Sequence, residues 1–135
     1  MFWTGENNLM ISDTKFENES VIGVPSTDRN GNQFENTLVG SYVVIPKSHV
    51  STPFDLTEHE WADTKKMIDI IKQYLDEKYK PDGYNLGWNV GRIAGQEVKH
   101  AHLHVIPRFA DEPFAGKGIR HWLKKDENSR PHNNA

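Results

Sequence analysis

Short stretches of the chain are rich in β-branched residues or alternate between apolar and polar positions, and both patterns predict strands. Ser20–Val24 and Leu38–Pro46 contain the β-branched runs. Residues 84–90 alternate, with apolar side chains at Tyr84, Leu86, Trp88 and Val90. Between the first two runs, the dipeptide Asn30-Gly31 is a strong turn signal. We therefore expect the first two segments to be strands with a turn between them, and residues 84–90 to form a strand paired near the strand that contains His100, His102 and His104.

One long helix is predicted between the second and third of these strands. Thr57 and Glu60 have the spacing of a capping box, in which each side chain binds the other residue's backbone N–H. A stripe at helical spacing follows, made of Trp61, Thr64, Ile68, Ile71 and Leu75. The helix should run over residues 58–79 and end before Pro81-Asp82-Gly83. We expect Trp61 and the isoleucines to lie in the core.

Antiparallel strands joined by a helix predict an α+β domain. The length of 135 residues is typical of one domain, which we assign to residues 1–135. From about residue 110 the chain becomes a polar C-terminal tail, and residues 126–135 are expected to fray. Within this tail, residues 116–122 combine glycines, cations and a tryptophan. They are either solvated around one packed Trp122, or Lys117, Arg120 or Trp122 reaches a ligand site, since cations suit phosphate and a tryptophan ring suits an aromatic base.

Three histidines at alternate positions are the main candidate for chemistry. A strand places residues i, i+2 and i+4 on one face, so His100, His102 and His104 should line one side. Ala101, Leu103 and Val105 should then be buried on the other side. Imidazole has its unperturbed pKa nearest neutrality, which suits a nucleophile, a proton shuttle or a metal ligand. A three-histidine zinc site and a merely solvated face are the alternatives.

The region around these histidines resembles the signature of the histidine triad (HIT) superfamily. Residues 89–108 match an Asn, a glycine-containing loop ending in Ala-Gly-Gln, and then a His-x-His-x-His run with apolar residues between. Residues 42–50 resemble the family's earlier strand and the turn after it. The resemblance covers about residues 38–110. It implies an antiparallel sheet of about five strands with one long helix and a short one.

The resemblance also implies an activity, which is nucleotidyl transfer or hydrolysis at the α-phosphate of a nucleoside phosphoramidate or dinucleoside polyphosphate. By position, His102 resembles the covalent nucleophile, and His100 and His104 resemble the flanking residues that orient it and bind phosphate. Covalent catalysis of this kind splits one difficult displacement into two easier ones. The loop Gly91–Gln96 would supply backbone N–H donors to the phosphate. Substrate or phosphate binding is assigned to Asn89, Gly95, Gln96 and Glu97.

Three positions depart from the family pattern. Ser41 stands where many members have a fourth histidine, and a serine is a weaker proton partner. Glu97 stands where many members have Ser or Thr. Its carboxylate repels phosphate unless it is protonated or turned away, so it is either a proton donor or, as we favour, solvent-facing. The acidic residue that holds the ribose hydroxyls has one candidate, Asp28, inside the polar stretch 27–36.

Composition excludes several classes of function. The formal net charge of −3 provides no basic field, so nucleic acid is not expected as a partner. No apolar run is long enough to span a membrane, and residues 1–8 do not resemble a signal peptide. The absence of cysteine excludes disulfides and the cysteine zinc site of some family members. We expect a cytoplasmic homodimer with a nucleotide substrate and no cofactor or metal.

Two other functions remain open from the residues alone. One is a metal-dependent hydrolase that uses the three histidines, and the other is a nucleotide-binding regulatory protein with little catalysis. The remaining histidines are expected to be incidental or simply exposed, and they are His49, His59, His121 and His132.

Overall fold

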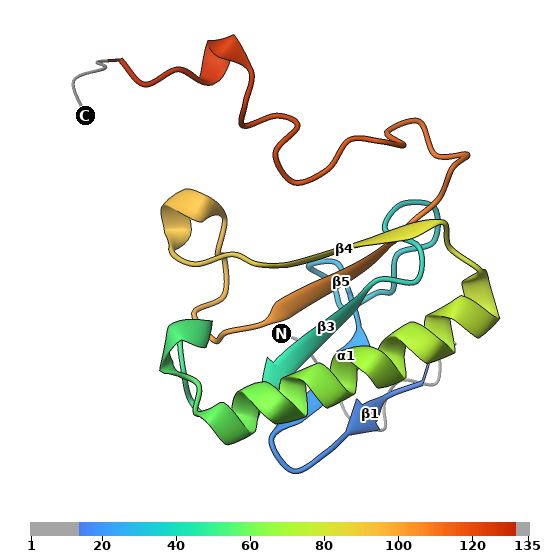
Figure 1. Ribbon diagram of the computed structural model, residues 1–135, viewed down its shortest axis with the longest axis vertical. Coiled ribbons are helices and arrows are strands. Elements are labelled where there is room, and N and C mark those ends of the chain that lie inside the picture. Colours follow the sequence, from blue (N-terminus) through green and yellow to red (C-terminus); the bar gives the residue numbers. More distant parts are fainter. Residues whose placement is uncertain (1–13, 132–135) are drawn as a thin grey trace.

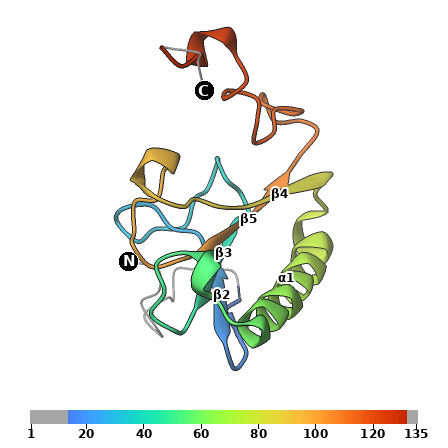
Figure 2. The same cartoon turned by 60° about the vertical axis from the view of Figure 1, so that its left-hand side comes forward.

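The computed structural model describes residues 14–131, and within them one antiparallel sheet and one α-helix form the α+β fold that we expected (Figure 1). The sheet contains β1 (Phe16–Glu17), β2 (Val21–Pro25), β3 (Tyr42–Pro46), β4 (Gly83–Trp88) and β5 (Leu103–Arg108). Their spatial order is β1-β2-β3-β5-β4, which puts the histidine-bearing β5 inside the sheet. The helix α1 (Glu58–Tyr79) crosses one face only (Figure 2).

The helix begins and ends where the sequence predicted. The Thr57 side chain accepts from the Glu60 N–H, and the Glu60 carboxylate accepts from the Thr57 N–H, which completes the capping box. At the other end Lys80 adopts a left-handed conformation with φ of 52°. The expected short helix takes the form of three-residue 3-10 turns: η2 (Pro53–Asp55), η3 (Arg92–Ala94) and η4 (Asp126–Asn128).

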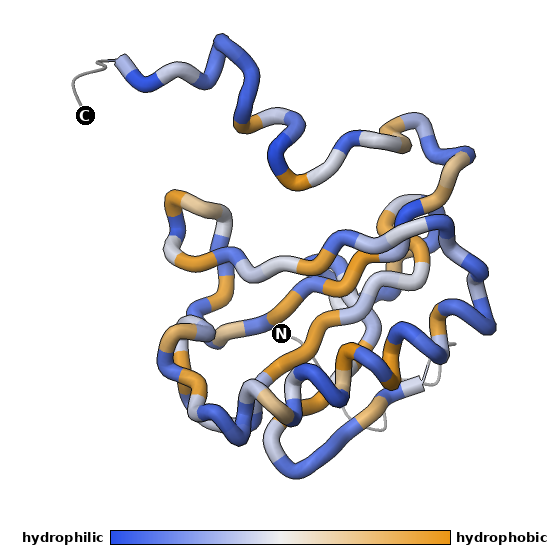
Figure 3. Tube along the Cα trace, viewed as in Figure 1, coloured by the Kyte–Doolittle hydropathy of each residue, from blue (hydrophilic) through white to orange (hydrophobic). Residues whose placement is uncertain are grey.

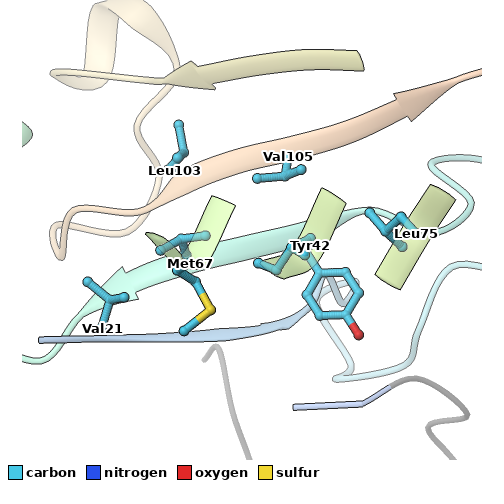
Figure 4. Close-up of a cluster of buried hydrophobic side chains, with 8 residues drawn as sticks. Val21, Tyr42, Met67, Leu75, Leu103 and Val105 are labelled. Carbon is cyan, nitrogen blue, oxygen red and sulfur yellow. The ribbon is translucent and has the colours of Figure 1, made fainter. Parts of the chain in front are cut away.

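The core lies between α1 and the sheet. Its fully buried members come from both layers (Figure 4) and are Val21, Tyr42, Val44, Met67, Ile71, Leu75, Leu103 and Val105. The expectation that Trp61 is a core residue was wrong. Trp61 is 44% exposed, and its ring lies 5.8 Å from that of Trp88 in the edge strand β4. Met67 fills the core instead, and Ile70 faces solvent.

Strand lengths differ from the prediction at two places. β3 starts at Tyr42, because Leu38 and Gly40 take positive φ values of 51° and 78° that turn the chain. β4 ends at Trp88, so Val90 belongs to the following loop. The strong turn at Asn30-Gly31 is present, since the Gly31 N–H donates to the Asp28 carbonyl oxygen at 3.0 Å.

The C-terminal segment after Arg108 is irregular but is not uniformly polar (Figure 3). It exposes four large apolar side chains: Phe114, Ile119, Trp122 and Leu123. The Arg108 guanidinium anchors its first half by donating to the Glu112 carboxylate and to the Lys117 and Phe114 carbonyl oxygens. Within residues 14–131 no helix has the length and apolar character needed to cross a membrane.

Candidate active site

A pocket of about 390 Å³ lies on the sheet face opposite α1. Its floor contains Val43 of β3, which pairs with His104 of β5. Two loops supply the walls, one between β2 and β3 and one between β4 and β5. The lining residues are Pro25, Ser26, Thr27, Asp28, Arg29, Phe34, Leu38, Ser41, Val43, Asn89, Gly95, Glu97, Val98, His102, His104 and Ile106.

The alternation along residues 101–105 is as the sequence predicted. Ala101, Leu103 and Val105 are buried, while the intervening histidines are half-buried. β5 itself begins only at Leu103, so of the three histidines only His104 is a strand residue. The extended backbone before the strand still turns His102 to the pocket side.

The hydrogen bonding of His102 defines its tautomer. Its Nδ1–H donates to the backbone carbonyl oxygen of His100 at 2.9 Å. A carbonyl oxygen only accepts, so Nδ1 must carry the proton and the neutral ring must have its lone pair on Nε2. This tautomer has its lone pair on Nε2, which is what a nitrogen nucleophile requires, in a side chain that lines the pocket.

His104 lies beside His102 in the pocket, with 4.9 Å between the ring centroids and the planes near perpendicular at 71°. Burial lowers the pKa of His104, and the neighbouring His102 lowers it further. Both causes penalise the charged ring. His104 is thus held neutral beside the nucleophile candidate.

His100 has a different environment. Its Nε2–H donates to the Pro46 carbonyl oxygen at 2.7 Å, at the end of β3. His100 does not line the pocket, and its ring meets that of His49 at a centroid distance of 6.1 Å. The structure thus brings His102 and His104 together and gives His100 a bracing position behind them.

The loop Gly91–Gln96 does not present the row of N–H donors that we expected. The N–H of Gly91 donates to Gln96 Oε1 at 2.8 Å. The N–H groups of Ala94, Gly95 and Gln96 donate to carbonyl oxygens of Gly91 and Arg92. These four groups are satisfied inside the loop, because a 3-10 turn closes it. The expectation of phosphate donors from them was wrong.

Gln96 holds this loop in shape. Its side chain is buried outside the pocket, and its amide nitrogen donates to the carbonyl oxygens of Ser51 and Val98 at 2.7 and 3.1 Å. Gly95 and Asn89, by contrast, both line the pocket. A long 3.5 Å contact joins Asn89 Nδ2 to the Gly95 carbonyl oxygen, which leaves the amide easily redirected to a ligand.

The pocket rim contains charged residues of both signs. Glu97 is exposed, as we favoured, yet it also lines the pocket. Asp28 lines it too, and its Oδ1 accepts from the N–H groups of Asn30 and Asn32. Sequence reasoning missed Arg29 and Phe34 in the same wall. The one sequence feature near Arg29 and Phe34 that could have indicated their position was the turn that begins at Asp28.

The C-terminal candidates lie elsewhere. Lys117 and Trp122 line a second hollow of about 560 Å³, where Lys117 Nζ lies 5.6 Å from the Trp122 ring. Arg120 lines neither pocket. His121 packs edge to face on Trp122, and His132 is outside the described residues.

Curated relatives cover the central part of the chain. An adenosine 5′-monophosphoramidase, hnt1 of Schizosaccharomyces pombe, is 34% identical over 82 residues, which are 61% of this chain and 59% of the relative. A bis(5′-adenosyl)-triphosphatase of Dictyostelium discoideum is 37% identical over 71 residues, 53% of this chain and 48% of the relative. The chain thus matches about half the length of such relatives.

Solved structures match over a wider range. SMU.412c of Streptococcus mutans UA159 is 34% identical, covers 78% of this chain and 63% of its own, and has a TM-score of 0.61. A HIT family protein of Bacillus anthracis is 31% identical, covers 77% of this chain and 70% of its own, and also has a TM-score of 0.61. The model of the HIT domain matches residues 38–111, which contain β3, α1, β4, β5 and both pocket histidines. The chain therefore belongs to the HIT domain family.

Proposed function

We propose that the protein is a nucleotide hydrolase or transferase that acts at the α-phosphate of a nucleoside phosphoramidate or a dinucleoside polyphosphate. The observation that carries this proposal is the tautomer of His102, with its proton on Nδ1 and its lone pair on Nε2, in a side chain that lines the pocket. The activities named for the phosphoramidase and triphosphatase relatives support the same substrate class.

In the proposed reaction His102 Nε2 attacks the α-phosphorus, and the bond from phosphorus to the leaving group breaks. The leaving group takes a proton from solvent at the pocket mouth. Water then attacks the same phosphorus, loses its proton to solvent and breaks the P–N bond, which returns the electron pair to Nε2. The intermediate ring carries positive charge, and the His100 carbonyl oxygen that accepts from Nδ1–H stabilises it.

The other predicted site residues divide into contact and positioning roles. Neutral His104 and the Asn89 amide are available to phosphate oxygens from the pocket wall. Gly95 allows a phosphate to approach the backbone of the pocket wall closely, because it has no side chain. Its φ of 101° is a conformation that favours glycine. His100 and Gln96 act through others, since each binds backbone behind the pocket. Glu97 acts as a rim charge.

The test is to trap the covalent intermediate. Adenosine 5′-monophosphoramidate and diadenosine triphosphate are each mixed with enzyme, quenched in base and digested for mass spectrometry. We expect one adenylyl group on His102, and about 10⁴-fold lower turnover in His102→Ala. His121→Ala, a histidine outside the pocket, is the matched control and should turn over normally. Near-normal turnover by His102→Ala would reject the mechanism.

We also propose a cytoplasmic homodimer. β4 ends the strand order β1-β2-β3-β5-β4, so one side of its backbone has no neighbouring strand among the described residues. Such an edge favours pairing with another strand. Sedimentation equilibrium should give twice the chain mass of 15.5 kDa at micromolar concentration, and a 15.5 kDa species would contradict the dimer.

A further inference from the structure

Ser41 has a buried hydroxyl whose hydrogen-bonding capacity is unused. The residue is 5% exposed, and its Oγ has no hydrogen-bond partner among the described residues. Its backbone is fully engaged, because its N–H donates to the Leu38 carbonyl oxygen and its own carbonyl oxygen accepts from Ser26. Leaving a buried hydroxyl unpaired is unfavourable, so each such group in a native protein calls for an explanation.

The position of Ser41 in the pocket suggests the explanation. Ser41 lines the pocket, and the register Val43↔His104 and Tyr42↔Val105 puts it level with Ile106. By the same register Ile45 is level with His102. Ser41 is therefore four residues along the floor from the nucleophile candidate, or about 13 Å at the usual rise of a strand. A nucleotide that lies along this pocket with its α-phosphate at His102 would have its base at the Ser41 end.

The floor around Ser41 is apolar, although Ser26 and Thr27 also line this pocket. Val43 and Ile106 flank it on the floor, and Phe34 and Leu38 line the same pocket. These side chains suit the faces of a heterocyclic base but give an enclosed water few of the partners that it needs. Of the hydroxyls that line this pocket, the Ser41 hydroxyl is the one that is buried without a partner among the described residues. It is suited to hydrogen bonding a polar group on the edge of the base.

We propose that the Ser41 hydroxyl binds the base edge of the nucleotide and is a specificity-determining residue of this pocket. This inference rests on the proposed function. Rotation about the χ1 torsion of Ser41 can turn its hydroxyl to the ligand when a nucleotide fills the pocket. A hydrogen bond to the base would give this hydroxyl the partner that it lacks among the described residues.

The binding test compares nucleotides with a ligand that has no base. Calorimetric titrations of the unmodified protein and Ser41→Ala use AMP, GMP, CMP, UMP and ribose 5-phosphate. At least one nucleotide should bind Ser41→Ala about five- to tenfold more weakly, the usual effect of one hydrogen bond. Ribose 5-phosphate should bind both proteins equally. Equal weakening for ribose 5-phosphate, or no weakening for any nucleotide, would overturn the inference and leave the proposed function standing.

Ser20→Ala is the matched control, because Ser20 is also buried but its Oγ donates to Asp63 Oδ2 at 2.6 Å, outside the pocket. Ser20→Ala should lower the Tm by about 5 °C and leave nucleotide affinity unchanged. Ser41→Ala should keep or raise the Tm, since it removes an unpaired group. A fall in the Tm of Ser41→Ala with unchanged affinity would assign the hydroxyl to structure and reject the inference. Failure of every nucleotide to bind the unmodified protein would reject the proposed function itself.

Discussion

The imidazole rings of His102 and His104 meet edge to face, with their centroids 4.9 Å apart. At this separation a proton on one ring opposes a proton on the other, and the partial burial of His104 adds to the penalty. His104 is therefore suited to stay neutral where an isolated histidine begins to charge. This property can be tested through stability, because it does not depend on turnover.

Because the pKa of His104 is lowered, the free energy of unfolding should decrease at acidic pH. Unfolded histidine titrates near pH 6.5, so below that pH the unfolded state binds a proton that the folded state resists. Stability due to this group is therefore highest above pH 6.5 and falls as the pH drops toward the lower folded pKa. Urea unfolding at pH 7.5 and 5.5 measures the difference. His104→Asn should lose less stability between these two pH values than the unmodified protein, and an equal loss would contradict the assignment.

The contribution of His59 to stability should depend on pH in the opposite direction. Its Nε2 lies 2.7 Å from Glu19 Oε1 and 3.3 Å from Asp63 Oδ2, and the Glu19 contact followed by the Asp63 charge raises its pKa. Lys66, 3.9 Å from Asp63 Oδ1, opposes this rise. The stabilisation is fully present below pH 6.5 and is lost as the pH rises through the higher folded pKa. We expect the Tm advantage of the unmodified protein over His59→Gln at pH 6 to shrink by pH 8.5, and a growing advantage would refute the pairing.

Gln96 should be more important for the loop than for phosphate contact. Gln96→Ala removes one acceptor and two donor bonds, so we expect a loss of about 1–3 kcal/mol in the free energy of unfolding. Gln96→Glu keeps the acceptor for the Gly91 N–H but brings a carboxylate to the carbonyl oxygens of Ser51 and Val98. It should be at least as destabilising. Full stability with lost substrate binding would instead indicate direct phosphate contact.

Glu97 should act as a repulsive rim charge. An exposed carboxylate near a phosphate costs about 1 kcal/mol at 4 Å in water, or roughly a fivefold change in affinity. Glu97→Gln should therefore lower KM by up to about fivefold at low ionic strength, with kcat unchanged. At 1 M salt, where the Debye length is about 3 Å, the difference should vanish. A fall in kcat would identify Glu97 as a proton donor.

Local sequence signals predicted the helix better than they predicted its buried face. The capping box at Thr57 and the breakers after Tyr79 act within a few residues, so the predicted and observed helix limits agree. Whether Trp61 or Met67 is buried depends on where the sheet ends beneath the helix. The predicted strand start at Leu38 was wrong for a related reason. Leu38 and Gly40 have positive φ values, which end the extended conformation despite the β-propensity of their neighbours.

Apart from Ser41 and Asp28, the pocket residues that could be predicted belong to one continuous stretch of sequence. His102 and His104 reach the pocket because alternation along one segment decides their side. Arg29 and Phe34 come from a loop whose position over the floor depends on long-range packing. The satisfied N–H groups of the 91–96 loop were also invisible, because a glycine-rich loop and a closed 3-10 turn have the same composition.

In the segment 101–105, Ala101, Leu103 and Val105 are buried, whereas His102 and His104 line the pocket. Inserting or deleting a single residue there would push imidazoles into the apolar interior and aliphatic groups into the pocket, so folding and chemistry would fail together. The number of residues in this segment therefore cannot change by one without loss of both folding and activity. Diversification of what the protein accepts must instead occur in the two wall loops, where length can vary without moving a core residue.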